Sequence, residues 1–128
     1  MRVLLDTSVL IDSARPGELE GAISAASLAE LHFGVLVAAT EDERARRSQR
    51  LGVIEATFDP LAVDAAVARE WGRLAAAIVS RGGQSRRRAL ELVIAATANV
   101  HHVPLLTLNP KDFALVADLV DARAPTPR

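Results

Sequence analysis

The stretch that decides the fold is Met1–Asp12, MRVLLDTSVLID. Its apolar run, Val3–Leu5, has the composition of a short buried strand and stops at an acid, Asp6. The next two residues are hydroxyl-bearing types that cap helices, so we expect a helix over about 8–14. A strand that runs directly into a helix leaves Asp6 at the carboxyl end of the strand, where open α/β sheets bind ligands. Taken alone, however, Asp6 is more simply explained as a helix cap.

Length and composition indicate one domain without a disulfide framework. The chain has 128 residues, a net charge of −1 and no cysteine, which also excludes a thiolate metal site. We expect a single domain over residues 1–123 and a flexible tail over 124–128, where two prolines lie. No secretion signal or membrane-spanning run is recognisable, so the expected location is the cytoplasm.

The remainder of the chain alternates between helical and strand-like patterns. Such alternation favours an α/β fold with three layers, α/β/α, around a mostly parallel central sheet. Asp59–Pro60 has the residue types that open a helix, while Arg81–Ser85 contains two glycines and reads as a loop. The expected helices are 25–39, 41 to about 52, 60–80 and 86–100, and the expected strands are 54–58, 103–108 and 119–121.

Three further acids lie where surface charges are unusual. Glu30 has no basic residue three or four positions away on its expected helix, so it is either solvated at the helix edge or held by a partner or metal. Glu91 begins an apolar run and could equally pair with the arginines one turn before it. Asp112 follows an expected strand, as Asp6 does, although it could instead form an Asx turn or a helix cap.

Together the acids are more informative than any one of them. Asp6 and Asp112 follow strands, and Glu30 and Glu91 lie on helices that could flank the same sheet edge. Converging carboxylates without cysteine suit Mg²⁺ or Mn²⁺, which prefer oxygen ligands. Metals held in this way can activate water and stabilise the charge that develops during phosphodiester cleavage.

Arginines form two clusters, one over 44–50 and the other at Arg86, Arg87 and Arg88. Both clusters could be solvated helix faces, or they could contact phosphates. Aromatic residues make up only 3% of the chain, so a base-stacking platform of the kind used by single-strand binders is not expected.

Four ordered motifs resemble a known family. They are VLLDTSVLID around Asp6, SLAELHFGV around Glu30, ALELVIAATA around Glu91 and LLTLNPKDF around Asp112. In this order and spacing they resemble the PIN-domain ribonucleases, specifically the VapC-type toxins of type II toxin–antitoxin systems. The resemblance extends over nearly the whole chain.

The resemblance implies a PIN fold and a Mg²⁺- or Mn²⁺-dependent endoribonuclease that cleaves structured RNA, tRNA or rRNA. Its chemistry would be attack by a metal-activated water, leaving a 5′-phosphate and a 3′-hydroxyl. The matching positions would make Asp6, Glu30, Glu91 and Asp112 the catalytic and metal-binding acids, accompanied by the polar residues Thr7, Thr107 and Asn109. One position departs from the family, because the third acid is usually Asp and here it is Glu91.

The resemblance also implies partners. A VapB-type antitoxin would block the acidic groove, and the toxin would form a homodimer that assembles with antitoxin into a heterotetramer or larger complex. The apolar residues Leu28, Leu31 and Val35 could form the docking surface or could simply belong to the core. Arg86, Arg87 and Arg88 are the candidates for contact with RNA phosphates.

Other classes remain as alternatives. Because of Glu91, the chain could be a metal-impaired binder that docks antitoxin or RNA without efficient cleavage. A phosphoacceptor role for Asp6 is less favoured, since haloacid-dehalogenase phosphatases need an acid where Ser8 stands and receiver domains need acids where only Arg2 precedes the strand. A Rossmann domain is excluded because no G-x-G-x-x-G follows the first strand.

Overall fold

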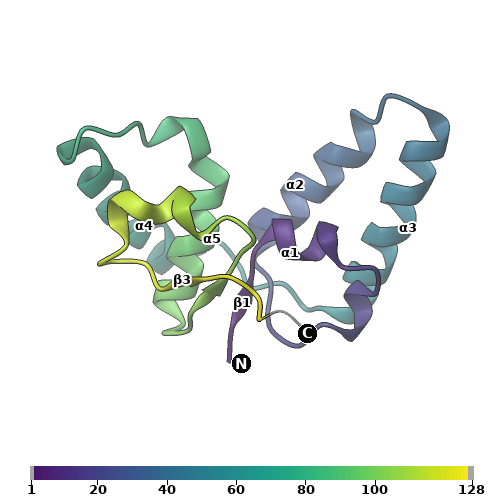
Figure 1. Cartoon of the computed structure of the whole chain (residues 1–128), viewed down its shortest axis with the longest axis horizontal. Helices are drawn as coiled ribbons and strands as arrows, with labels where there is room; N and C mark the ends of the chain where they lie inside the picture. Colours follow the sequence, from purple (N-terminus) through teal and green to yellow (C-terminus); the bar gives the residue numbers. More distant parts are fainter. Residues whose placement is uncertain (1, 127–128) are drawn as a thin grey trace.

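The structure is a computed structural model that describes residues 2–126 (Figure 1). It consists of short strands, each two residues long, and five α-helices. Residues 127–128 of the expected tail lie outside this range, and residues 124–126 form no regular structure. The strands are β1 (Leu4–Leu5), β2 (Leu105–Leu106) and β3 (Ala122–Arg123). The helices are α1 (Thr7–Asp12), α2 (Ala25–Leu36), α3 (Glu41–Thr57), α4 (Ala65–Ser80) and α5 (Ala89–Val100), with 3₁₀ turns η1 (Pro16–Glu18), η2 (Arg86–Arg88) and η3 (Pro110–Val116).

The sheet is parallel, with strand order β1-β2-β3. In its register Leu5 lies opposite Leu106, so the residues that follow β1 and β2 emerge side by side. Single bridges add two more extended segments beyond β1, through the pairs Leu4 with Ala22 and Ser24 with Leu61. The topology therefore brings the ends of two strands that are distant in sequence to one edge.

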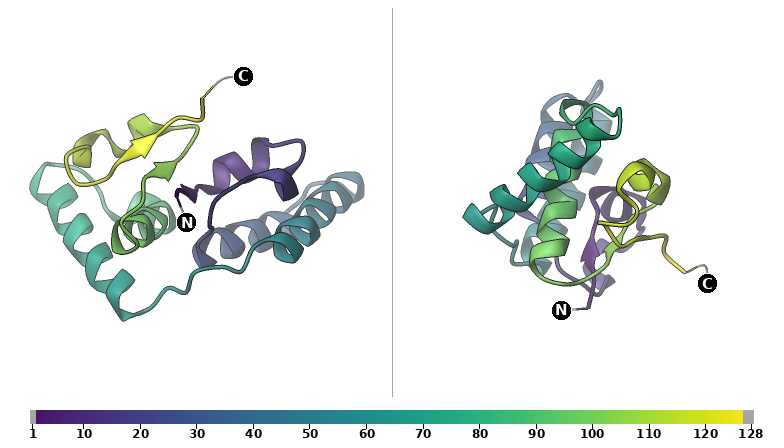
Figure 2. Two further views of the ribbon diagram at one scale, coloured as in Figure 1. Left: turned by 90° about the horizontal axis from the view of Figure 1, so that it is seen from below. Right: turned by 90° about the vertical axis from the view of Figure 1, so that its left-hand side faces the viewer.

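The two faces of the sheet carry separate cores, which gives the expected three-layer α/β fold. Neighbouring strand residues point to opposite faces, and accordingly Leu4 joins the core formed with α4, α5 and η3, whereas Leu5 joins the core formed with α1 and α3. Figure 2 shows α4 and α5 gathered on one side of the strands and α2 and α3 on the other. Leu10, Ile54 and Leu74 are fully buried anchors of these layers.

The helix starts expected at residues 25 and 41 are confirmed, and Ser24 and Thr40 cap these two helices. The Ser24 hydroxyl accepts a hydrogen bond from the Ala26 N–H at 3.0 Å, and the Thr40 hydroxyl accepts one from the Glu43 N–H at 3.1 Å. Each satisfies an N–H that has no partner within its own helix. Together they fix where the α2–α3 hairpin begins and turns.

The strand expected over 54–58 is wrong, because residues through Thr57 continue α3. Leu51 and Ile54, three residues apart, share one buried helix face. The helix expected over 60–80 ends at Ser80 as expected, but its expected start at Asp59–Pro60 is wrong. α4 begins at Ala65, and the Asp64 side chain before it accepts a hydrogen bond from the Val67 N–H at 3.0 Å.

Sheet pairing explains the delayed start of α4. The Leu61 N–H donates to the Ile23 carbonyl at 2.8 Å, and the Leu61 carbonyl accepts from the Ala25 N–H at 2.9 Å. These bonds hold the backbone around Leu61 extended beside residues 23–25. Hydrogen bonding to a distant segment here outweighs a local Asp-Pro signal.

Two further boundaries differ from expectation. The helix expected over 86–100 is divided, because Arg88 has φ −135° and ψ 47°, which separates η2 from α5. The last strand lies at Ala122–Arg123 rather than 119–121, since residues 119 and 120 still bond back to the Val116 carbonyl at 2.8 and 2.9 Å. Of the strand expected over 103–108, only Leu105–Leu106 is paired as a strand.

The apolar face of α2 that was a docking candidate packs against the core instead. Leu31 is buried, and Leu28 and Val35 pack against the same cluster. The exposed apolar side chains of this region are different ones, Phe33, Leu36 and Val37. Within residues 2–126, no helix is long and apolar enough to cross a membrane.

Candidate active site

Asp6 lies at the carboxyl end of β1, directly beside Thr107 at the end of β2. Its Oδ2 accepts hydrogen bonds from the Thr107 hydroxyl at 2.8 Å and from the Ser8 hydroxyl at 2.7 Å. Asp6 occupies the N-cap position of α1, but its side chain makes no capping bond. Its carboxylate is therefore held at the sheet edge by neighbouring hydroxyls, and the simpler helix-cap interpretation is wrong.

Glu30 reaches the same edge from α2. Its Oε1 lies 2.7 Å from the Thr7 hydroxyl, which also lies 3.0 Å from the Ser27 hydroxyl. Burial is the main cause that raises the pKa of Glu30; the Thr7 hydrogen bond opposes the rise and the negative charge of Asp6 adds to it. The carboxyl is thus half-buried beside another acid, and no basic residue among the described ones pairs with it.

Glu91 projects from the first turn of α5 into the same region. Burial raises its pKa most, Arg88 lowers it, and the charges of Asp112, Asp6 and Glu30 raise it again. The negative charges of the three other candidate acids therefore act on the Glu91 carboxyl, and the four acids form one electrostatic cluster. Its Oε2 is buried and accepts no hydrogen bond from the described residues.

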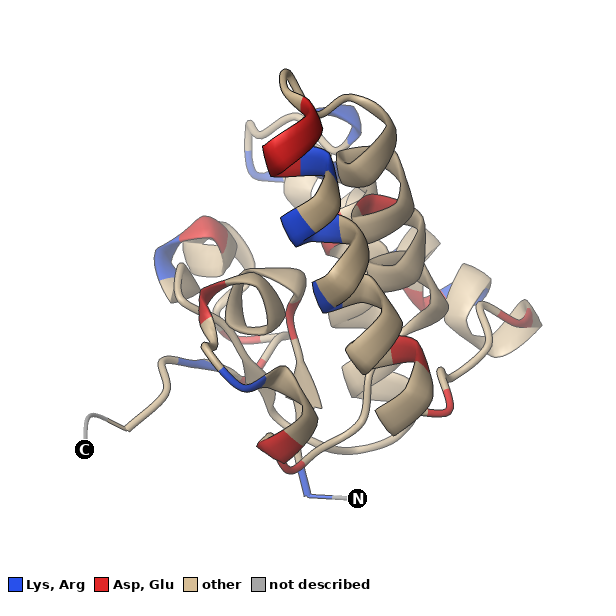
Figure 3. Cartoon of the chain, turned by 90° about the vertical axis from the view of Figure 1, so that its right-hand side faces the viewer, with Lys and Arg blue, Asp and Glu red and all other residues tan. Residues whose placement is uncertain are grey.

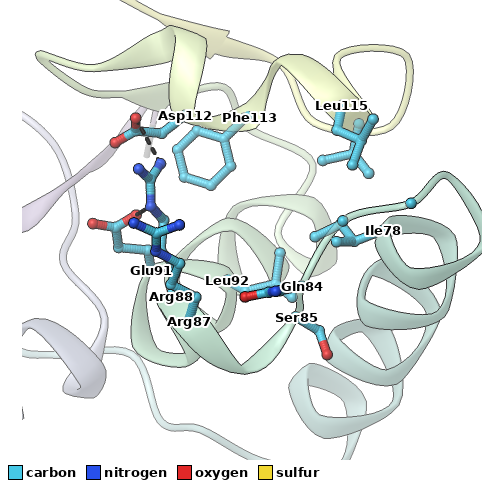
Figure 4. A pocket seen from close by; sticks show the side chains of 13 residues that line it. Ile78, Gln84, Ser85, Arg87, Arg88, Glu91, Leu92, Asp112, Phe113 and Leu115 are labelled. Atoms are coloured by element: carbon cyan, nitrogen blue, oxygen red, sulfur yellow. Dashed lines mark ion pairs between the residues drawn. The ribbon is translucent and has the colours of Figure 1, made fainter.

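Asp112 lies on η3 and is paired with an arginine. The Arg88 Nη1 approaches the Asp112 Oδ1 to 2.6 Å, whereas the Arg88 Nε is 3.9 Å from the Glu91 Oε2, which is too long for a hydrogen bond (Figure 4). The ion pair expected as one explanation of Glu91 is therefore loose. The closer partner of Arg88 is Asp112.

The three polar residues expected to support the acids differ in burial and in the bonds that they form. Thr7 and Thr107 are buried and bonded to Glu30 and Asp6, respectively. Asn109 is exposed, and it contributes its backbone N–H to the Thr107 hydroxyl at 3.1 Å rather than a side-chain cap. Ser8 also holds the Asp6 carboxylate, a role not expected from the sequence; its place two residues after Asp6, in the first helical turn, is the signal for that contact.

The two arginine clusters have different environments. In the cluster over 44–50, Arg46 and Arg47 pair with Glu43 at 2.5 and 2.8 Å on the same helix, and Arg47 also donates to the Gly34 carbonyl at 2.6 Å. Figure 3 shows basic residues spaced along α3 after its acidic first turn. This cluster is a helix face with local ion pairs, whereas the cluster at η2 lies beside the acids.

A pH dependence of stability follows from the raised pKa values. Glu30 and Glu91 bind protons more tightly in the folded chain than in the unfolded chain, where a glutamate has its ordinary pKa of 4.5. As the pH rises above 4.5 and through the pKa values of the folded chain, these two carboxyls therefore lower the free energy of unfolding. Replacing both with glutamine should raise the melting temperature by about 2–5 °C near neutral pH in EDTA. This gain in melting temperature should be smaller at a pH near 4.5, the ordinary pKa of a glutamate. Thermal circular dichroism at both pH values checks this, and a pH-independent difference would contradict it.

Comparison with known proteins gives close relatives, although no family model matches the chain. Ribonuclease VapC5 of Mycobacterium tuberculosis is 39% identical over 120 residues, covering 87% of this chain and 84% of that protein. Ribonuclease VapC4 of the same organism is 34% identical over 125 residues, covering 92% and 93%.

Solved structures agree with these relatives. The crystal structure of VapBC-5 from Mycobacterium tuberculosis contains a chain that matches with a TM-score of 0.78 and 34% identity, over 96% of both chains. A chain of DNA-bound VapBC from Salmonella typhimurium matches with a TM-score of 0.79 over 97% and 98%, and at 18% identity it supports the fold alone.

The short parallel sheet with acids at its carboxyl edge defines a PIN-like α/β domain. With relatives this similar over nearly its whole length, the chain belongs to the VapC family of ribonucleases, the toxins of VapBC toxin–antitoxin systems.

Proposed function

We propose that the chain is a Mg²⁺- or Mn²⁺-dependent endoribonuclease toxin that cleaves structured RNA, tRNA or rRNA, and is neutralised by a VapB-type antitoxin. The observation that carries the proposal is the Glu91 Oε2, a buried carboxylate oxygen with no hydrogen-bond partner in the described chain. A buried carboxylate oxygen that accepts no hydrogen bond is costly, and the Arg88 Nε at 3.9 Å is too far away to donate one. A divalent cation beside Asp6, Glu30 and Asp112 would offset that cost.

The donor set has the right chemistry for such an ion. Carboxylates are the ligands that Mg²⁺ and Mn²⁺ prefer, and they would come from Asp6, Glu30, Glu91 and Asp112. Within residues 2–126 no three acidic or histidine side chains lie together as a ready metal site. Arg88 instead holds Asp112, so an ion bound there competes with its guanidinium.

When bound, the cation would supply an activated water and stabilise the charge of the pentacovalent transition state. The chain itself would position the groups: Ser8 and Thr107 hold the Asp6 carboxylate, and Thr7 holds that of Glu30. Glu30 or Glu91 would take up the proton of the attacking water.

Cleavage of total RNA tests the proposal. Purified protein is incubated with Mg²⁺, with Mn²⁺ or with EDTA, and the new 5′ ends are sequenced. We expect a few defined cuts that carry 5′-phosphates with either metal and none in EDTA. Equal cleavage in EDTA would contradict metal dependence, and no cleavage under any condition would contradict the ribonuclease assignment.

Arg86 and Arg87 are the proposed contacts to RNA phosphates. Both are exposed, and neither forms an ion pair within residues 2–126. Arg88, expected to act with them, is already held by Asp112. A triple alanine variant at 86–88 should lose RNA affinity at low salt, and full retention of affinity would contradict this role.

A VapB-type antitoxin is the proposed partner because the similar chain with a solved structure is part of VapBC-5, a toxin–antitoxin complex. We also propose a homodimer that assembles with antitoxin into a heterotetramer or larger complex. Co-expression with the product of the neighbouring open reading frame should restore growth to cells that produce the chain. Failure of that rescue would contradict the pairing.

A second candidate function is that of a metal-impaired binder, favoured by the Arg88–Asp112 ion pair and by Glu91 in place of Asp. Glu91→Asp shortens the side chain by one methylene, and metal sites are sensitive to such changes. If the site is impaired, Glu91→Asp should bind Mn²⁺ about threefold to tenfold more tightly by calorimetry. Equal or weaker binding would favour the competent enzyme.

A further inference from the structure

A cavity of about 380 Å³ opens beside Glu91 and Asp112. It lies between the loop over 82–85, η2 and the start of α5 on one side and η3 on the other (Figure 4). Its volume is near the lower end of the range for small-molecule sites, about 300–1,000 Å³, which suits one flat heterocycle rather than a long ligand.

The walls of this cavity are of two kinds. Ile78 and Leu92 on one side and Phe113 and Leu115 on the other supply apolar surface, as Figure 4 shows. Gln84 and Ser85 supply polar groups from the loop. An apolar slot with a few polar groups at its edge is the composition with which proteins hold an unstacked base of RNA.

The polar group best placed to read a base is Gln84. Its side chain is exposed and forms no hydrogen bond with the rest of the described chain, so its amide offers both donors and an acceptor. Arg87 also lines the cavity without an ion pair among residues 2–126. Among the described residues, this wall therefore carries an amide that is free to form hydrogen bonds and a positive charge that is free to form an ion pair.

The loop that carries Gln84 is fixed against η3. Arg81 donates to the Leu115 carbonyl at 2.9 Å and pairs with Asp118 at 2.7 Å. Gly83 lies so close to the apolar wall that a Cβ would come within 2.6 Å of Leu115 Cδ2 and 2.7 Å of Ile78 Cγ2. These contacts shape the cavity in the absence of any ligand.

We propose that this cavity is a nucleobase subsite, which receives the base of a nucleotide adjacent to the cleaved phosphodiester. It rests on the proposed ribonuclease function, because the acids at its mouth would act on the attached phosphate. Apolar side chains hold the ring, the Gln84 amide bonds its edge, and Arg87 meets the neighbouring phosphate. The subsite would thus contribute to the choice of cleavage site.

Binding of nucleotides without cleavage provides the first test. The whole protein is titrated in EDTA with each of the four nucleoside 5′-monophosphates and followed by NMR. We expect shifts at the Gln84 side-chain amide and the Leu115 methyls, with one base bound most tightly. In Gln84→Ala the preferred nucleotide should bind about threefold to tenfold more weakly. No shifts at these groups with any nucleotide would overturn the subsite.

A matched control is Gln49→Ala, which changes the only other glutamine of the chain, exposed on α3. This variant should bind all four nucleotides as wild type does. If Gln49→Ala weakens binding as much as Gln84→Ala, the effect is not specific to the cavity and the proposal fails.

Cleavage of a randomised RNA pool provides the second test. The wild-type protein should show a base preference at one position beside the cut, and Gln84→Ala should flatten it at that position alone. An unchanged preference in Gln84→Ala would overturn the subsite even if cleavage is normal. If the wild type cuts no RNA, the ribonuclease function fails, whereas the nucleotide titration still decides whether the cavity holds a base.

Discussion

Replacing Asp6 with asparagine should reduce RNA cleavage at least about 100-fold, more than the loss typical of residues that only support metal ligands. Asparagine has nearly the same shape, and its side-chain oxygen can still accept hydrogen bonds from Ser8 and Thr107. The substitution therefore removes a negative charge and leaves the strand end intact. Cleavage rates with Mg²⁺ or Mn²⁺ on one defined RNA measure the loss.

The matched control is Asp12→Asn, on the same short helix. Asp12 is exposed at the end of α1 and forms no ion pair in the described part of the chain. Its variant carries the same change in net charge and should cleave at the wild-type rate. Wild-type cleavage by Asp6→Asn would contradict the assignment of the site, provided that melting temperatures show both variants to be folded.

Replacing Arg88 with alanine should strengthen Mn²⁺ binding by about tenfold, equivalent to about 1.4 kcal/mol. Arg88 Nη1 lies 2.6 Å from the Asp112 carboxylate, so its guanidinium competes with a cation for that group. Removing the side chain frees Asp112 and removes the positive charge nearest to Glu91. Calorimetric titration of the wild type and the variant with Mn²⁺ measures the difference.

Arg87→Ala separates this effect from a general change of charge. Arg87 is a neighbour in the same 3₁₀ turn and forms no ion pair within residues 2–126. Its variant should leave Mn²⁺ affinity nearly unchanged. Equal gains in both variants would show that overall charge, rather than the contact with Asp112, controls the metal; weaker binding by Arg88→Ala would show that Arg88 positions Asp112 for the ion.

The location of Asp6 was predictable from sequence because this residue directly follows a strand. An apolar run that stops at an acid places Asp6 at the edge of the sheet, and the parallel pairing of β1 with β2 brings Thr107 beside it. The helix caps at Ser24 and Thr40 were also predictable, since such caps are local.

Features that depend on distant segments were not predictable in this way. Asp59–Pro60 carries a local helix signal, but Leu61 is held extended by backbone bonds to residues 23–25. The partner of Arg88 was also hidden: sequence spacing offered Glu91, whereas folding brings Asp112 closer. In both cases the deciding contact joins residues that no periodic pattern relates.

The hydrogen bond between Thr107 and Asp6 joins residues 101 positions apart. During synthesis β1 is made before β2, Asp112 and β3. A nascent chain that ends before β2 therefore has Asp6 and Glu30 but not the strand that lies beside them. In a chain made from its N-terminus, the Asp6 carboxylate therefore gains its Thr107 hydrogen bond only after residue 107 has been added.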